Sequence, residues 1–269
     1  MPADLAKLCG DLLAETGTLE SMLASLEEEG WHRPTPAPGW DIGDQVTHLA
    51  YYDERAALAI RQPDRFVAER AQGGDTQARS APQRRRHLSG ADRLSWLRRA
   101  RRDFVAASLG VDPATRIPWY GPEMSVATAV TARIMETWAH GQDVADTLRV
   151  ERIATGRLYH IAYLGSKTVA NSYRAHGLPI PDAPVRVELT GPNGAAWTFG
   201  PAGVPDVVRG SALDFCLVVC QRRHLLDTDL ELQGPVARGW MSIAQAFAGP
   251  PGGGRRPGQF GARGAPGRR

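Results

Sequence analysis

The sequence has little of what marks a secreted or membrane-spanning protein. Only three cysteines occur in 269 residues, too few for a disulfide framework. No run of about 18 apolar residues is present, so we expect no transmembrane helix. The N-terminus has early acids and no basic stretch followed by an apolar one, so we expect no signal peptide. These absences predict a protein of the reducing cytoplasm.

Several motifs of common enzyme classes are also missing. The chain has no G-x-G-x-x-G turn after a strand, no P-loop and no G-x-S-x-G elbow. Nucleotide-dependent chemistry and serine hydrolysis are therefore set aside. No basic stripe with interleaved aromatics occurs, so we expect no nucleic-acid binding by the folded part of the chain.

The positive net charge comes from the C-terminal end. The chain has a formal charge of +3, and residues 250–269 hold five arginines and no acid, so the rest carries −2. A segment so rich in glycine and proline cannot bury enough apolar surface to order itself. We therefore predict a disordered tail over residues 250–269.

Helical periodicity dominates the chain up to residue 178. The first predicted helix, about residues 3–28, has an apolar face made of Leu5, Leu8, Leu12, Leu19 and Leu23. Further helices are expected at about 42–61, after Ser89, after Ser125 and at about 155–176, with residues 63–89 as a connection. Four long helices predict a bundle over residues 1–178, an architecture that builds metal sites from inward-facing side chains.

The pattern changes in residues 179–249. VRVELTG and AAWTFG alternate with a period of two around the turn-forming residues Pro192 to Gly194. A helix follows, in which Cys216 and Cys220 are expected to pack as small apolar residues. A short strand and a final helix complete a small α+β domain. The predicted fold class is therefore mainly α with a small α+β domain.

Glu136 and His140 form the most informative pair in the chain. Their i, i+4 spacing places both side chains on one face of a helix, and His48 lies in the middle of another predicted helix. Two imidazoles and one carboxylate would hold a divalent ion, with Zn²⁺ expected, and leave one position open for catalysis. The alternative is a solvated polar helix face, against which the apolar flanks of the pair argue.

Other residues have two interpretations each. Asp143 follows His140 by three positions and would orient an imidazole, act as a base or form a surface salt bridge. Asp44 precedes His48 by one turn, and N-terminal capping is the favoured interpretation. Trp119 and Tyr120 would line a cofactor pocket at the mouth of the bundle or pack in the core.

Three sequence blocks carry a family resemblance over nearly the whole chain. They are TPAPGWDIGDQVTHLA (Thr35 to Ala50), METWAHGQDVAD (Met135 to Asp146) and QRRHLLDT (Gln221 to Thr228). The chain resembles the mycothiol-dependent maleylpyruvate isomerase family, and within it an actinobacterial metal-binding branch. The resemblance implies a DinB-like metal-binding four-helix bundle followed by a sterol-carrier-protein-like α+β domain.

The resemblance also implies a site and an activity. The zinc ligands of the family fall on His48, Glu136 and His140, and a basic residue that binds substrate or thiol falls near Arg222 and Arg223. We expect these arginines to act across a cleft between the two domains, although a solvent-facing pair at a helix end has equal weight. The implied activity uses mycothiol for S-transfer or for cis–trans isomerisation of a small electrophilic substrate.

Two other functions remain open from the residues themselves. A three-ligand ion that binds water instead of a thiol would make the protein a metal-dependent hydrolase. A site without an accessible pocket would make it a non-catalytic metal or small-molecule binding module. The expected partners are a small electrophile and a thiol, with no nucleic acid and no membrane, in a monomer or homodimer.

Overall fold

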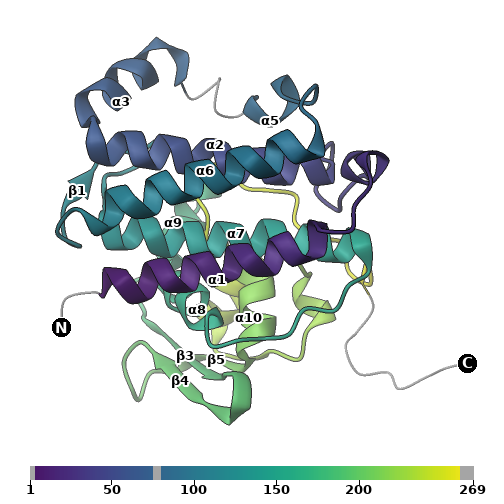
Figure 1. Cartoon of the computed structure of the whole chain (residues 1–269). Coiled ribbons are helices and arrows are strands. Elements are labelled where there is room, and N and C mark those ends of the chain that lie inside the picture. Colours follow the sequence, from purple (N-terminus) through teal and green to yellow (C-terminus); the bar gives the residue numbers. More distant parts are fainter. Residues whose placement is uncertain (1–3, 75–79, 261–269) are drawn as a thin grey trace, which may run out of the picture. The chain divides into compact units, whose positions relative to one another are not determined.

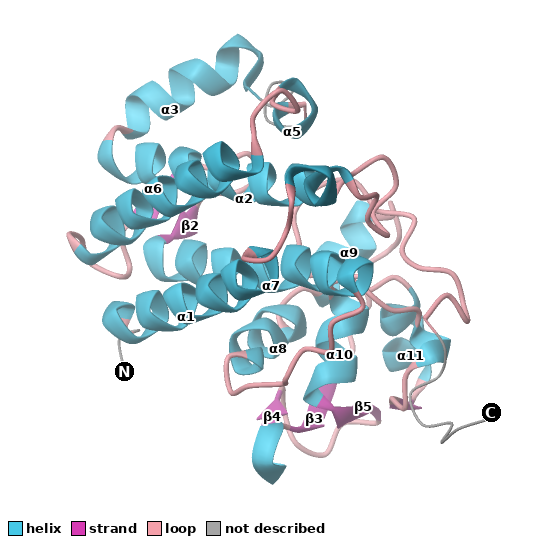
Figure 2. Ribbon diagram, turned by 45° about the vertical axis from the view of Figure 1, so that its right-hand side comes forward, coloured by secondary structure: helices cyan, strands magenta, loops and turns pink. Residues whose placement is uncertain are grey.

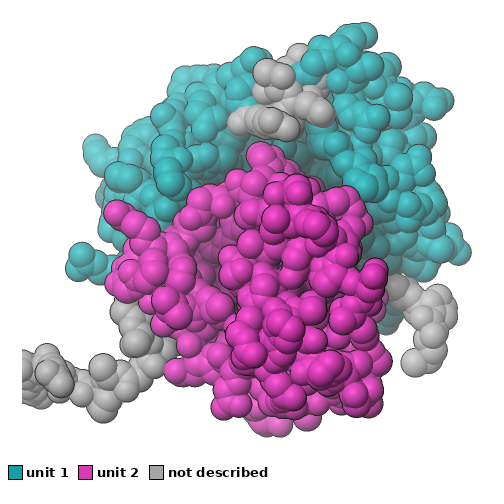
Figure 3. All heavy atoms as spheres, turned by 180° about the vertical axis from the view of Figure 1, so that it is seen from behind, with its two compact units in different colours: residues 1–152 teal, residues 153–269 magenta. Residues whose placement is uncertain are grey.

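The computed structural model describes residues 4–74 and 80–260, and the chain forms two compact units, Met1–Arg152 and Ile153–Arg269 (Figure 3). This division lies one helical segment before the boundary that we expected near residue 178. The segment predicted at 155–176 belongs to the second unit, and it breaks into two helices, α8 (Leu158–Ser166) and α9 (Val169–Ala175). Tight packing of α8 on a helix of that unit is the physical reason, because a Cβ atom on Gly165 would lie 2.9 Å from Val219.

The first unit is the expected helical bundle. Its four long helices run side by side in both Figure 1 and Figure 2 and contact one another: α1 (Leu5–Leu23), α2 (Ile42–Arg61), α6 (Gly90–Leu109) and α7 (Val126–Leu148). The five leucines of the predicted apolar face are all buried. Helix α1 ends at Leu23, five residues earlier than predicted, and a 3₁₀ helix follows at Glu28–His32.

Side-chain caps fix where these helices begin. Asp41 and Asp44 form a reciprocal capping box at the start of α2, since each carboxylate accepts the backbone N–H of the other. Ser125 caps α7 through a 3.1 Å bond from the N–H of Thr128. Capping by Asp44 was the interpretation favoured from the sequence, and the structure confirms it.

The predicted connection at residues 63–89 contains helices that we did not expect. They are α3 (Pro63–Glu69) and α5 (Ala81–Arg84), with a short π-type turn at Arg70–Gly74 after α3. Pro63 opens α3 where its missing N–H costs nothing. Phe66 is fully buried, and the Arg55 guanidinium lies 5.1 Å from its ring. One buried aromatic side chain thus attaches a polar, arginine-rich segment to the bundle.

A buried ionic group ties three of the long helices together. Asp53 on α2 accepts 2.6 Å and 2.8 Å hydrogen bonds from Arg101 on α6 and Arg133 on α7. Arg101 also donates to Thr16 on α1 and Thr137 on α7. Burial lowers the pKa of Arg101, and the neighbouring Asp53 opposes that shift. The group aligns α2 with α7, the two helices that carry the predicted ligands.

The second unit contains a mixed four-stranded sheet of order β4-β3-β5-β6. The strands are β3 (Val185–Thr190), β4 (Ala196–Phe199), β5 (Asp206–Ser211) and β6 (Glu231–Gln233). Strands β3 and β4 form the predicted hairpin, while β3 and β5 are parallel. We did not predict β5, although it is an inner strand. The small α+β domain is nevertheless confirmed.

Two helices, α10 (Ala212–Val219) and α11 (Pro235–Ser242), pack against this sheet. Cys216 and Cys220 are fully buried, as expected, and burial raises the pKa of the Cys216 thiol well above its usual value. In the described part of the chain, no helix is both long and apolar enough to cross a membrane.

The beginning of the predicted disordered tail is packed, and that part of the prediction is wrong. The N–H of Gly258 donates to Asp227, and the Phe260 ring centroid lies 3.9 Å from the Arg223 guanidinium. Arg255 is buried. Polar and cation–π contacts thus hold a segment that has few apolar residues, while residues 261–269 lie outside the described part.

Candidate metal centre

The structure brings His48, Glu136 and His140 together at the contact between α2 and α7. Oε2 of Glu136 lies 3.2 Å from Nε2 of His48 and 3.2 Å from Nε2 of His140. One ligand atom from each residue lies within 4.8 Å of the other two. Among the described residues, no other group of three His, Cys, Asp or Glu side chains converges in this way.

The three side chains are shielded but still accessible. His48, Glu136 and His140 keep 17%, 21% and 11% of their side-chain surface exposed. Burial opposes ionisation of Glu136, yet hydrogen bonds from His140 and His48 outweigh it and hold the pKa of Glu136 well below its usual range. The carboxylate is therefore charged at neutral pH. These exposures contradict the alternative of a solvated polar helix face.

This donor set fits a divalent cation. Two imidazole nitrogens and one carboxylate oxygen are ligands that Zn²⁺ accepts, and a three-ligand protein site leaves a position for substrate or water. Oε2 of Glu136 lies close to both imidazole rings. Its negative charge is therefore next to the two Nε2 atoms that would bind the cation. The remaining exposure of all three side chains gives a small ligand a way in.

Aromatic rings surround the two histidines. Trp40 lies 5.7 Å from His140 in a stacked arrangement and 5.4 Å from His48, measured between ring centroids. Tyr52, one turn after His48, lies 4.6 Å from the His48 ring. Aromatic rings therefore border the site.

Trp119 and Tyr120 continue this aromatic border. Tyr52 lies 6.0 Å from Trp119 and 5.7 Å from Tyr120, so both predicted residues are one ring away from His48. Burial raises the pKa of the Tyr120 hydroxyl, which keeps it neutral. Trp119 also stacks on Phe66, with 7° between the ring planes. Both residues combine core packing with a place near the site.

An amide from α2 holds the far side of the His140 ring. Nδ1 of His140 forms a short hydrogen bond with Oε1 of Gln45, which is 1% exposed. Nε2 of Gln45 lies 2.8 Å from the hydroxyl of Thr35, and that hydroxyl lies 2.9 Å from the carbonyl oxygen of Trp40. The ring is thereby connected to the loop that carries Trp40.

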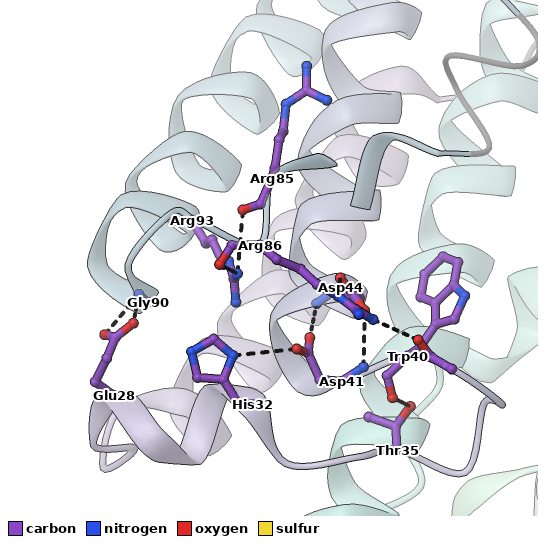
Figure 4. A network of polar contacts seen from close by, with 11 residues as sticks. Glu28, His32, Thr35, Trp40, Asp41, Asp44, Arg85, Arg86, Gly90 and Arg93 are labelled. Carbon is purple, nitrogen blue, oxygen red and sulfur yellow. Dashed lines mark hydrogen bonds and ion pairs between the residues drawn. The ribbon is translucent and has the colours of Figure 1, made fainter. Parts of the chain in front are cut away.

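Figure 4 shows how this loop is anchored at the start of α2. Arg86 donates to both carboxylate oxygens of Asp44 and to the carbonyl of Gly39, the residue before Trp40. Asp44 is fully buried. The capping group of α2 therefore also fixes the loop, which places Trp40 against the candidate ligands.

Asp143 lies on α7, one turn after His140, and its side chain is fully buried. Arg222 and Arg223 follow α10 in the second unit. Each donates to a nearby backbone carbonyl, Arg222 to that of Cys220 and Arg223 to that of Arg222, both at 2.6 Å.

Trp40, Gln45 and Tyr52 were not predicted as site residues from the sequence. Gln45 and Tyr52 lie three positions before and four positions after His48, which places all three on one helical face. That stripe was a usable signal for both residues. Trp40 had a weaker signal, because a tryptophan after P-x-P-G in a loop does not show which ring it will contact.

Comparisons with known proteins show the family of this chain. A family model described as the mycothiol maleylpyruvate isomerase N-terminal domain matches residues 12–145, which include all three candidate ligands. Two uncharacterized proteins of Mycobacterium tuberculosis, from strains CDC 1551 and H37Rv, are each 41% identical over 256 residues, covering 94% of this chain and 100% of their own.

A solved structure shares the fold of both parts. A mutant form of mycothiol-dependent maleylpyruvate isomerase is similar with a TM-score of 0.53 and 12% identity, over 80% of this chain and 88% of that one. Identity this low speaks for the fold alone. Together with the family model and the two mycobacterial relatives, it shows that the chain belongs to the mycothiol maleylpyruvate isomerase-like family.

Proposed function

We propose that this protein is a metal-dependent enzyme that uses a low-molecular-weight thiol, mycothiol, to attack a small electrophilic substrate. The observation that carries the proposal is the convergence of His48, Glu136 and His140, with one carboxylate oxygen 3.2 Å from both imidazole nitrogens. The reaction class is S-transfer or thiol-assisted cis–trans isomerisation. The choice of mycothiol follows from membership of the family.

The three ligands would hold a divalent ion, with Zn²⁺ the best match to two nitrogens and one oxygen. Such an ion deprotonates a coordinated thiol at neutral pH. Glu136, ionised in its shielded position, balances part of the charge, and Trp40 and Tyr52 limit the access of water to the site. Each of these protein contributions exists in the fold before any substrate arrives.

Further residues belong to this proposal. Trp119 and Tyr120 would line the approach to His48 through Tyr52. Asp143 would position α7 beside His140 rather than exchange protons with solvent, because it is fully buried. Arg222 and Arg223 would bind a carboxylate of the thiol or of the substrate, since a guanidinium group recognises carboxylates bidentately.

The test begins with metal analysis of the purified protein, followed by calorimetric titration with mycothiol and with glutathione as the control thiol. We expect one divalent ion per chain and heat of binding with mycothiol only when the metal is present. Thiol consumption is then measured with a neutral alkylating agent, and isomerisation with a cis-unsaturated dicarboxylate. Turnover that requires both metal and mycothiol supports the proposal.

The other functions predict different results. A hydrolase would cleave ester or amide substrates with metal and without thiol. A binding module would hold the metal and turn nothing over. To test the arginines, Arg222→Ala and Arg223→Ala are compared at equal metal loading. Unchanged thiol affinity and turnover in both variants would remove them from the proposal.

A further inference from the structure

The hydrogen bonds behind His140 form a chain whose direction is fixed at one end. The chain runs from the carbonyl oxygen of Trp40 through the hydroxyl of Thr35 and the amide of Gln45 to Nδ1 of His140. A carbonyl oxygen can only accept, so the Thr35 hydroxyl must donate its single hydrogen to Trp40. The Thr35 oxygen is then an acceptor toward Gln45.

This donor fixes which atom donates in each of the next two hydrogen bonds. Because the Thr35 oxygen accepts, the NH₂ group of Gln45 must point to it, and this fixes which way the amide is turned. Oε1 of Gln45 then faces His140 and can only accept. Nδ1 of His140 must therefore carry a hydrogen.

A neutral imidazole has one N–H, so Nε2 of His140 is left with its lone pair. That lone pair points toward the charged oxygen of Glu136, 3.2 Å away. A cation must lie between these two electron-rich atoms, either a proton shared by Nε2 and Glu136 in the metal-free site or a metal ion that takes its place. The arrangement thus prepares His140 to bind a metal ion through Nε2.

We propose that Gln45 and Thr35 are positioning residues that set the tautomer of His140 and thereby the metal affinity of the site. The inference rests on the metal site in the proposed function. Gln45 touches neither substrate nor metal, and its action passes through His140. Its 1% exposure keeps water from replacing the bond, and stacking of Trp40 on the same ring holds the imidazole plane.

Matched variants test the two ends of the chain. Gln45→Leu removes the acceptor and keeps most of the volume, while Gln45→Glu restores an oxygen acceptor. Thr35→Val removes the hydroxyl, while Thr35→Ser keeps it. Gln142→Leu is the control, because Gln142 is a shielded glutamine of α7 whose amide donates to Asp146 and not to a ligand.

Affinity for Zn²⁺ is measured by competition with a chelator, with circular dichroism as the check on folding. We expect Gln45→Leu to weaken binding by about 10–100-fold, the usual effect of losing a hydrogen-bond partner of a metal-binding histidine. Thr35→Val should lose less, because the freed amide can still present its oxygen. Gln45→Glu, Thr35→Ser and Gln142→Leu should bind nearly as the natural protein does.

The tautomer itself is read from long-range proton–nitrogen correlation spectra of the metal-free natural protein with isotope-labelled histidine. The proposal requires His140 to carry its hydrogen on Nδ1, and a hydrogen on Nε2 instead overturns it even if Gln45→Leu does not fold. Natural affinity in Gln45→Leu, or an equal loss in Gln142→Leu, also overturns it. The expected tautomer in a protein that binds no metal would sink the proposed function and leave the assignment of the tautomer standing.

Discussion

Glu136 offers one oxygen to two histidines, and this makes the site sensitive to the loss of any single ligand. Its Oε2 atom lies 3.2 Å from both Nε2 atoms, and each of the three residues offers one ligand atom. In a site with three protein ligands and an open position, the loss of one ligand leaves only two protein groups to bind the ion. Single substitutions should therefore separate metal binding from folding.

We predict that His140→Ala abolishes metal binding and leaves the fold intact. Loss of a hydrogen-bond partner of a ligand lowers metal affinity by up to about 100-fold. Loss of the ligand itself should lower it by more. Alanine has a higher helix propensity than histidine, so α7 should persist. Metal content after dialysis and the far-ultraviolet circular dichroism spectrum are the measurements. The control is His176→Ala, at an exposed histidine of the second unit, and full metal content in His140→Ala would show that His140 is not a ligand.

The sequence could predict the spacing of the candidate ligands but only some of the residues that contact them. Glu136 and His140 are one turn apart on one helix, so their shared face follows from helix geometry alone. The contact of Gln45 with His140 joins two helices separated by 95 positions, and no local pattern encodes it. Contacts across helices depend on how the core packs, which a single sequence does not specify.

At the scale of elements, the close approach of α2 and α6 is the strictest requirement. A Cβ atom on Gly43 would lie 1.5 Å from Nη1 of Arg93, a fully buried side chain that donates to the carbonyl of Arg86 at 2.9 Å. Arg93 cannot move without losing this bond, which also helps to hold Arg86 near Asp44. Glycine at position 43 is thus needed for helix packing rather than for backbone freedom.

We predict that Gly43→Ala destabilises the protein, against its helix propensity. Propensity alone would favour alanine by about 0.8–1.0 kcal/mol inside a helix, but the added methyl group overpacks the contact and should cost about 1–3 kcal/mol. Gly17→Ala is the matched control, because Gly17 lies in α1 and an added Cβ there would have no neighbour within 4 Å. Urea denaturation should lower the midpoint for Gly43→Ala and raise it for Gly17→Ala, and a raised midpoint for both would refute the clash.

The ionic group of Asp53, Arg101 and Arg133 gives a second prediction at this scale. Removing the single acid between two buried arginines leaves both charges without a carboxylate, which typically costs about 3–5 kcal/mol. We therefore expect Asp53→Asn to lower the free energy of unfolding by that order. Asp103→Asn, at an exposed position of α6, should change it by much less. Equal effects of the two changes would mean that the buried charges are not coupled.

At the scale of the whole molecule, the order of a helical unit followed by an α+β unit could be predicted, but not its boundary. The segment at residues 155–176 has the same helical period as the bundle, and periodicity does not say which core a helix joins. Strand β5 is as long as β3, but its buried residues Asp206, Val207 and Val208 are consecutive and do not alternate, so the pattern does not indicate a strand. Both differences from the expectation have the same cause, because long-range contacts decide where α8 and β5 belong.

The boundary leads to a last prediction, made with two fragments, residues 1–152 and residues 1–178. The longer fragment carries α8 without α10, the helix that α8 contacts at Gly165, and Leu158 and Ile161 of α8 are buried in the full chain. We therefore expect residues 1–178 to bind a hydrophobic dye and to unfold with lower cooperativity than residues 1–152. Both fragments contain His48, Glu136 and His140, so each should bind one divalent ion.

Thermal unfolding, dye fluorescence and metal content are measured on both fragments beside the full chain. A cooperative residue 1–152 fragment that binds the metal would show that the site is complete within the first unit. The contrary result is a residue 1–178 fragment that folds and binds metal while residues 1–152 do neither. In that case α8 and α9 stabilise the bundle, and the boundary predicted from the sequence describes the folding unit better than the division at residue 152.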